Sequence, residues 1–262
     1  MLRPAHVAAV LAMVIAACAP QIRETAPEPR LALTQGPENF PRNDYEHAAA
    51  QGKTVYRIDP ARSLVSITVR RGGSLAHLGH DHVVASHEAQ GYIAPEEGRA
   101  DLYVPLRELS VDEPALRAEA GLDTQPSESE IAGTRLNMLD KVLEAQRFPF
   151  AIIRVSGLEK IPTGMRLLTV AITLHGVTRT FAVAAQIETG GGELSVTGLL
   201  EFNQSDFGIV PFSILGGAMQ VQDRLSLRFR IRARHGGSQA DQLRRLPLHR
   251  RFGHQAVGIA MD

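Results

Sequence analysis

The histidines between residues 77 and 87 form the densest group of side chains in this sequence that could do chemistry. Four of the ten histidines, His77, His80, His82 and His87, fall in this window, and Asp81 separates the middle two. On a strand, His80 and His82 would project from one face, about 6.6 Å apart along the chain, and could share a zinc or copper ion. His77 and His87 each lie an odd number of residues from His80, so a straight strand would point them away.

Two ligands fall short of the three or four that a strong zinc site needs. A third would have to come from a bend at Gly79 or from a distant residue such as His175. The same window also suits a polar turn at the end of a barrel, with Asp81 accepting hydrogen bonds from the backbone or from imidazoles. The sequence therefore leaves two interpretations open, a structural turn and a metal site of His80 and His82.

Motifs of known catalytic chemistry are missing from the sequence. It contains no nucleophile elbow, no phosphate-binding loop and no CxxC pair. Zinc catalysis would need a positioned base beside an open coordination position, and the histidine window indicates neither. We therefore predict a protein that is not an enzyme, with no catalytic residues and no cofactor.

The elements that must position these histidines are strands. From Val55 to Ala233, apolar and polar residues alternate in segment after segment, as expected for strands with one buried face. About eight such strands with short connections predict an all-β, antiparallel, up-and-down barrel without free edges. The inward-facing residues that we predict to contact a ligand are Val65, Ile67, Val69, Leu102, Val104, Phe150, Ile152, Leu168, Val170, Ile172, Leu225, Leu227 and Phe229.

One α-helix is inserted among the strands. Ser127 and Glu130 have the spacing of a capping box, which marks a helix start. An apolar stripe at helical spacing follows, formed by Ile131, Met138, Leu139, Val142 and Leu143. This helix is expected to lie across the barrel or to close one end of it. A weaker pattern indicates another helix over residues 113–120.

The first residues have the pattern of an export signal. An apolar run, Val7–Ala17, is too short to span a bilayer but suits a signal-peptide core over residues 1–17. It ends in Ile15-Ala16-Ala17-Cys18, which resembles the lipobox of bacterial lipoproteins. Cys18 is the only cysteine and can form no internal disulfide. Lipidation therefore gives this cysteine a role that disulfide formation cannot. The alternative is an ordinary secretory signal with a chance cysteine.

Two further segments flank the barrel. Residues 18–53 are rich in proline and read as a linker from the lipid, and residues 235–262 read as a basic, mobile tail. Acylation of Cys18 would tether the protein to a membrane, facing the periplasm, and the absence of Asp after Cys18 resembles the outer-membrane sorting default. The net charge of +0 predicts no nucleic-acid partner, and the oligomeric state is not specified.

Three motifs occur in order along the part of the chain that alternates. The first is the opening Tyr56-x-Ile58-Asp59, followed by Ser63 and a strand. The second is residues 173–178, TLHGVT, and the third is residues 205–209, SDFGI. Together these motifs resemble the YceI-like family of lipocalin-like, polyisoprenoid-binding proteins. The resemblance covers residues 54–234 and implies a lipocalin-like barrel around an isoprenoid lipid.

The leading functional prediction is thus an envelope lipoprotein that holds an isoprenoid or other long apolar lipid inside its barrel. Burying roughly 400 Å² of apolar surface would contribute about 10 kcal/mol before the costs of association. Two alternatives stay open on the sequence alone. One is a periplasmic metal-binding protein that uses His80 and His82, and the other is a scaffold whose inward side chains fill the barrel.

Overall fold

The computed structural model describes residues 36–158 and 163–236. The predicted signal peptide, Cys18 and the tail from residue 237 onward lie outside the described residues. No helix within the described part is long and apolar enough to cross a membrane.

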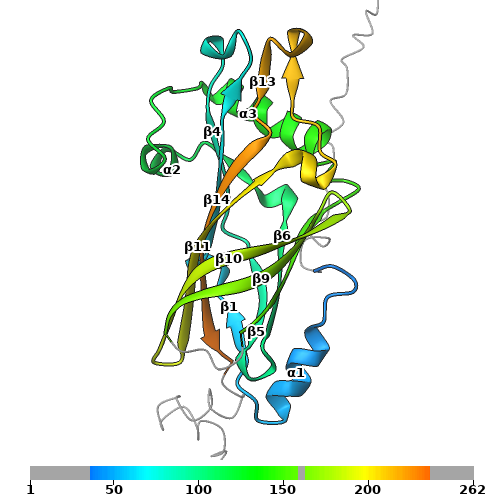
Figure 1. The fold of residues 1–262 in the computed structure, drawn as a ribbon, viewed down its shortest axis with the longest axis vertical. Coiled ribbons are helices and arrows are strands. Elements are labelled where there is room, and N and C mark those ends of the chain that lie inside the picture. The colour runs from blue at the N-terminus through cyan, green and yellow to red at the C-terminus, as the bar shows by residue number, and fades with distance from the viewer. Residues whose placement is uncertain (1–35, 159–162, 237–262) are drawn as a thin grey trace, which may run out of the picture. The chain divides into compact units, whose positions relative to one another are not determined.

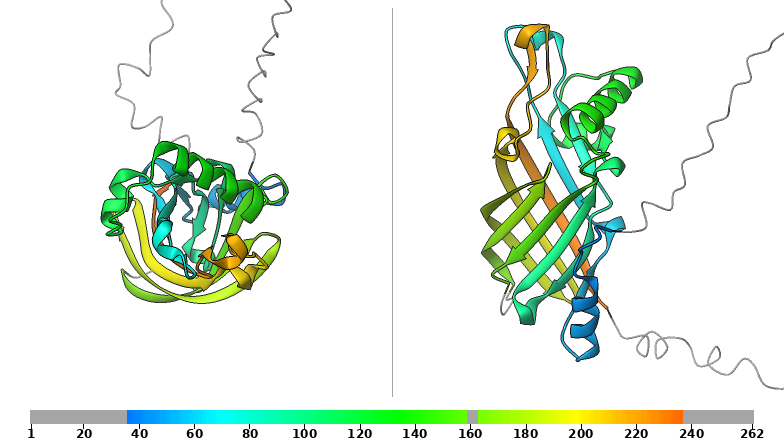
Figure 2. Two further views of the ribbon diagram at one scale, coloured as in Figure 1. Left: turned by 90° about the horizontal axis from the view of Figure 1, so that it is seen from above. Right: turned by 90° about the vertical axis from the view of Figure 1, so that its right-hand side faces the viewer.

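Eight antiparallel strands close into a barrel (Figures 1 and 2). Each strand pairs with the next in the order given below, and β14 pairs with β1 to complete the ring, so the predicted all-β barrel is confirmed. In this order the strands are β1 (Tyr56–Ile58), β5 (Gln90–Ala94), β6 (Arg99–Pro105), β8 (Phe150–Ser156), β9 (Gly164–Leu174), β10 (Val177–Gly190), β11 (Glu193–Asn203) and β14 (Arg224–His235).

Strands β2 (Leu64–Val69), β4 (His82–Ser86) and β7 (Ser110–Val111) continue the wall at one end of the barrel. β14 pairs with β1 near its C-terminus and with β2 nearer its N-terminus. Ser63, which precedes β2, links the end of β1 to β14. Its hydroxyl donates to the Asp59 carbonyl oxygen and accepts from the Arg232 N–H. These two bonds explain why a serine follows the Tyr-x-Ile-Asp opening.

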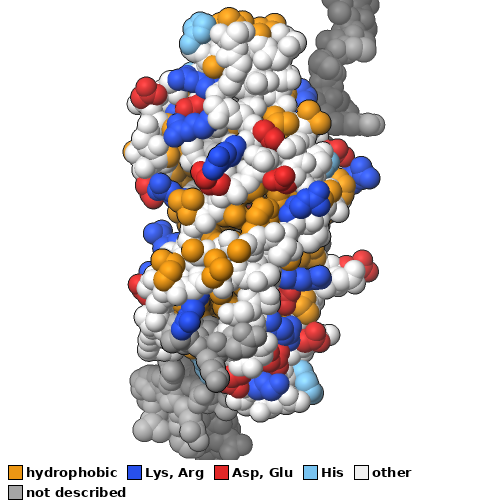
Figure 3. All heavy atoms as spheres, viewed as in Figure 1, with side chains coloured by type: hydrophobic (Ala, Val, Ile, Leu, Met, Phe, Trp, Pro, Cys, Tyr) orange, Lys and Arg blue, Asp and Glu red, His pale blue; other side chains and the backbone are white. Residues whose placement is uncertain are grey.

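Beyond this end of the barrel lies a small sheet of β12 (Ser213–Ile214), β13 (Met219–Val221) and β3 (Arg71–Gly72). Figure 1 places β13 at the same end as β4 and α3. Hydrophobic side chains reach the surface here, since Leu78 and Leu215 are 61% and 67% exposed. Figure 3 shows further hydrophobic side chains over β9–β11 among the charged ones.

The alternation predicted for the last strand holds. Leu225 and Ile231 are buried, whereas Arg224 and Arg228 face outward and are exposed. Gly198 on β11 is paired with Phe229, and a Cβ at Gly198 would lie 2.5 Å from Cζ of that ring. Glycine is therefore required at this position to let the phenyl ring cross the strand.

The inserted helix is α3 (Glu128–Asn137), followed by a π-helical segment at Met138–Val142. Its capping box is confirmed, because the Ser127 hydroxyl accepts from the Glu130 N–H and the Glu130 carboxylate accepts from the Ser127 N–H. The second, weaker helix is α2 (Pro114–Glu119).

A further helix, α1 (Arg42–Ala50), lies within the stretch that reads as a linker. Tyr45 on α1 is fully buried, and its hydroxyl donates to Asp101 of β6 at 2.7 Å. Burial and the Asp101 carboxylate both raise the pKa of the Tyr45 phenol. The folded body therefore begins before residue 54, because the α1 segment covers part of the outer face of the barrel.

Candidate ligand cavity and its polar end

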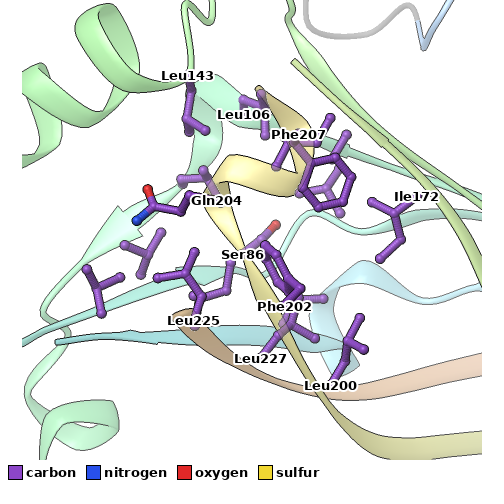
Figure 4. Close-up of a pocket in the computed structure, with 18 of the residues that line it drawn as sticks. Ser86, Leu106, Leu143, Ile172, Leu200, Phe202, Gln204, Phe207, Leu225 and Leu227 are labelled. Carbon is purple, nitrogen blue, oxygen red and sulfur yellow. The ribbon is translucent and has the colours of Figure 1, made fainter. Parts of the chain in front are cut away.

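The barrel encloses a cavity of about 420 Å³ (the barrel cavity; Figure 4). Figure 4 shows Ile172, Leu200, Phe202 and Leu227 from the barrel strands, and Phe207 from the turn after β11, gathered around it. No described residue that lines it is an aspartate, a glutamate or a lysine. The volume lies in the range of pockets that hold small ligands. The inward side chains therefore do not fill the barrel.

All but two of the predicted ligand-contacting residues line the barrel cavity. These are Val65, Ile67, Val69, Leu102, Val104, Leu168, Val170, Ile172, Leu225, Leu227 and Phe229. Their contact with a ligand stays a prediction.

The prediction of which β8 residues face the cavity is wrong. Phe150 and Ile152 do not line the cavity, whereas Ala151, Ile153 and Val155 do. Pairing with β6 explains the correction, because Ile153 lies opposite the inward-facing Leu102 and paired residues share a face of the sheet.

The outer face of β8 is apolar for a local reason. Phe150 packs edge-on against Tyr103 at a ring-centroid distance of 5.6 Å, and Phe40 packs on the same Tyr103 at 4.9 Å. The segment before α1 therefore helps to cover this part of the barrel from outside. Both faces of the strand are apolar, so alternation could not show which face is the inner one.

One end of the barrel cavity is polar. Arg70, Arg71, His80 and His82 line the cavity beside the small sheet, while strands β10 and β11 supply only apolar residues. Arg70 and Arg71 both form ion pairs with Asp81. Arg70 Nη1 donates to Asp81 Oδ2 at 2.8 Å, and the Arg71 N–H donates to Asp81 Oδ1 at 2.8 Å. Against the effect of burial, these contacts lower the pKa of the Asp81 carboxyl.

His82 belongs to a buried charge network. Its Nδ1 lies 2.6 Å from Oδ2 of Asp112, whose side chain is fully buried. Arg117 Nη1 donates to Asp112 Oδ1 at 2.6 Å, and the Val83 N–H donates to the same oxygen at 3.0 Å. Burial opposes ionisation of Asp112, but these donors outweigh it and lower its pKa. Asp112 is therefore a carboxylate that accepts the Nδ1 hydrogen of His82.

Among the described residues, only one of the two ring nitrogens of His80 has a polar partner. Its Nε2 lies 3.4 Å from Oε1 of Glu130 on α3. Its Nδ1 is buried and has no hydrogen-bond partner among the described residues. The rings of His80 and His82 lie 6.3 Å apart between centroids and are nearly perpendicular.

The other histidines of the motifs have separate contacts. His87 Nε2 lies 3.1 Å from both carboxylate oxygens of Glu113, and neither His77 nor His87 lines the barrel cavity. His175 forms the turn between β9 and β10, and its Nε2 contacts Glu144 at 3.1 Å. Within residues 36–158 and 163–236, no group of three or more potential metal ligands occurs.

Comparison with known proteins matches residues 56–233 to the model of the YceI-like domain. The chain belongs to the YceI-like family. The resemblance in the three motifs is thereby confirmed, and the boundaries agree closely with the barrel from β1 to β14. A search of curated protein sequences finds no significant match.

Solved structures with this fold include a polyisoprenoid-binding domain from Saccharophagus degradans implicated in plant cell wall breakdown. It is 14% identical, with a TM-score of 0.50, over 69% of this chain and 98% of that one. BcnA from Burkholderia cenocepacia is 16% identical, with a TM-score of 0.47, over 67% of this chain and 98% of its own. At these identities, the first likeness supports the YceI-like fold alone.

Proposed function

We propose that this YceI-like chain is a non-enzymatic binding module that holds an isoprenoid or a similarly long apolar lipid inside its barrel. The observation that carries the proposal is the barrel cavity, about 420 Å³ enclosed by aliphatic and aromatic side chains. An empty apolar cavity of this size costs stability, and a ligand that fills it regains the lost contacts.

A long hydrocarbon chain is the ligand that such a wall favours. Burying roughly 400 Å² of it contributes about 10 kcal/mol, of which association and chain ordering remove several. Charged side chains of the described residues line the cavity only at one end, so a chain in the middle of the barrel meets no charged group. The polyisoprenoid-binding domain from Saccharophagus degradans, which shares the fold, supports the same ligand class.

The end beside the small sheet offers a route for the lipid. Ile214 lines the barrel cavity and is also 44% exposed, so the cavity wall reaches the molecular surface there. Leu78 and Leu215 add exposed apolar surface at the same end. A lipid entering at this end would pass from the exposed apolar side chains to the apolar wall of the cavity.

The proposal includes a place in the cell envelope. The lipobox-like Ile15-Ala16-Ala17-Cys18 supports acylation at Cys18, and the proline-rich residues after it suit a tether on the periplasmic side, at the outer membrane.

Native mass spectrometry of the protein purified from bacterial membranes tests the proposal, with lipid extraction from the same sample. The expected result is a mass increment that extracts as an apolar lipid and disappears in a variant with a charged cavity wall. Protein that carries no lipid, and that takes up none from added isoprenoids, would contradict the proposal.

A further inference from the structure

Two imidazole nitrogens at the polar end of the barrel cavity have no hydrogen-bond partner among the described residues. We propose that His80 and His82 form a head-group site for a neutral hydroxyl at the end of an otherwise apolar ligand, such as an isoprenoid alcohol or a long-chain phenol. This inference rests on the proposed lipid-binding function and names the chemistry of the ligand's polar end.

The network behind His82 fixes which of its nitrogens accepts. Asp112 is an ionised acceptor, so Nδ1 of His82 must carry the hydrogen of their 2.6 Å bond. A neutral imidazole has one donor and one acceptor nitrogen, which leaves Nε2 as the acceptor. No hydrogen bond is formed by Nε2 within the described chain, although His82 lines the cavity.

Glu130 favours one tautomer of His80. Contacts to Ser127 and His80 lower the pKa of the Glu130 carboxyl, and its Oε1 lies 3.4 Å from Nε2 of His80, which favours the hydrogen on that nitrogen. The neutral ring then carries its lone pair on Nδ1, the buried atom without a partner in residues 36–158 and 163–236. Leaving such an atom unpaired costs free energy that a donor from a ligand would recover.

The surrounding charges favour a neutral head over an anion. Arg70 and Arg71 are paired with Asp81, and Arg117 is paired with Asp112. Together with Glu130, these groups are three arginines and three carboxylates, whose charges balance one another. Two acceptor nitrogens match a hydroxyl that donates.

The test compares probes that share one chain and differ in the head: geranylgeraniol, its acetate ester and its monophosphate. Binding to the full chain is measured by competition against a fluorescent fatty acid. The alcohol is expected to bind about tenfold more tightly than the acetate, as one hydrogen bond allows. His80→Leu and His82→Leu should each remove this preference, so that the alcohol and the acetate bind with similar affinity.

His87→Leu is the matched control, because His87 belongs to the same sequence window but lies outside the cavity wall. His80→Leu leaves the Asp112–Arg117 pair intact, so it keeps the test valid if His82→Leu does not fold. Equal affinities for alcohol and acetate, or tightest binding of the phosphate, would overturn the inference while leaving lipid binding in place. A zinc-induced rise of several degrees in Tm, lost in both variants, would overturn it in favour of a metal site. Failure of all three probes to bind would instead remove the proposed function itself.

Discussion

At the scale of single residues, Leu227 tests whether the cavity is a binding site. Its side chain lines the barrel cavity, so Leu227→Asp would place a carboxylate in an apolar wall. We expect lipid carriage to be lost and the free energy of unfolding to fall by about 3 kcal/mol or more. Lipid extraction and chemical denaturation of the same preparation measure both effects.

Leu199→Asp is the control for that substitution. Leu199 precedes the cavity-lining Leu200 on the adjacent strand β11, faces outward and is 51% exposed. The same chemical change there should leave lipid content and stability nearly unchanged. Equal loss of lipid in both variants would mean that the effect does not come from the cavity wall.

The Asp112 network makes a second prediction at this scale. Asp112→Asn should destabilise the protein by about 3 kcal/mol at pH 7, because it leaves the buried Arg117 without its counter-charge. The pKa of Asp112 is lowered in the folded state, so its contribution is fully present above the unfolded pKa of about 3.9 and is lost as pH falls through the folded pKa.

Urea denaturation of both proteins between pH 7 and pH 3 measures this effect. The stability difference between wild type and Asp112→Asn should be constant near neutral pH and shrink in the acidic range. Glu113→Gln, at the more exposed neighbouring carboxylate, should show little difference at any pH. A difference that does not change with pH would contradict the role assigned to the Asp112 charge.

At the scale of elements, the turn between β9 and β10 shows what the TLHGVT motif does. His175 and Gly176 both have positive φ, at 51° and 76°, as a tight hairpin turn requires. The His175 ring lies 4.7 Å from that of Phe148 and contacts Glu144, both in the segment that follows the π-helical turn. The motif therefore joins this hairpin to the chain that leads from α3 into β8.

Gly176→Ala tests that connection. A Cβ at Gly176 would lie 2.9 Å from Cε1 of Phe148, in addition to the strain of a positive φ. Gly192, in the next hairpin, has a φ of 79° but open space around it. We expect Gly176→Ala to cost about 1 kcal/mol more than Gly192→Ala, measured by thermal unfolding. Equal losses would show that the contact with Phe148 does not matter.

At the scale of the whole molecule, the proposal of a tethered lipid carrier depends on Cys18. In Cys18→Ser the sulfur that would be acylated is absent, so we expect the protein to stay unprocessed or to be released from membranes. Membrane fractionation and immunoblotting of the full chain measure this. A Cys18→Ser protein that is still processed after Ala17 and equally membrane-bound would rule out the lipoprotein proposal, while the barrel itself should fold unchanged.

The sequence by itself determined the barrel, the start of α3 and the family. Alternation along β14 follows from a strand with one wet and one apolar face, and the Ser127–Glu130 pair acts within one helical turn. Both signals are local, so spacing along the chain is enough to recognise them. The motif at Tyr56–Ser63 is readable for the same reason.

Only the tertiary structure decided the inner face of β8, the hollow interior and the partners of the histidines. Alternation of polar and apolar residues indicates which face of a strand contacts water. It gave the wrong inner face at Phe150 because Tyr103 covers that ring from outside. A cavity depends on how the side chains of all strands pack together, so the spacing of residues along one strand cannot predict it. His82 and Asp112 meet across 30 positions of the sequence because β4 folds back beside β7, and that register depends on the closed sheet.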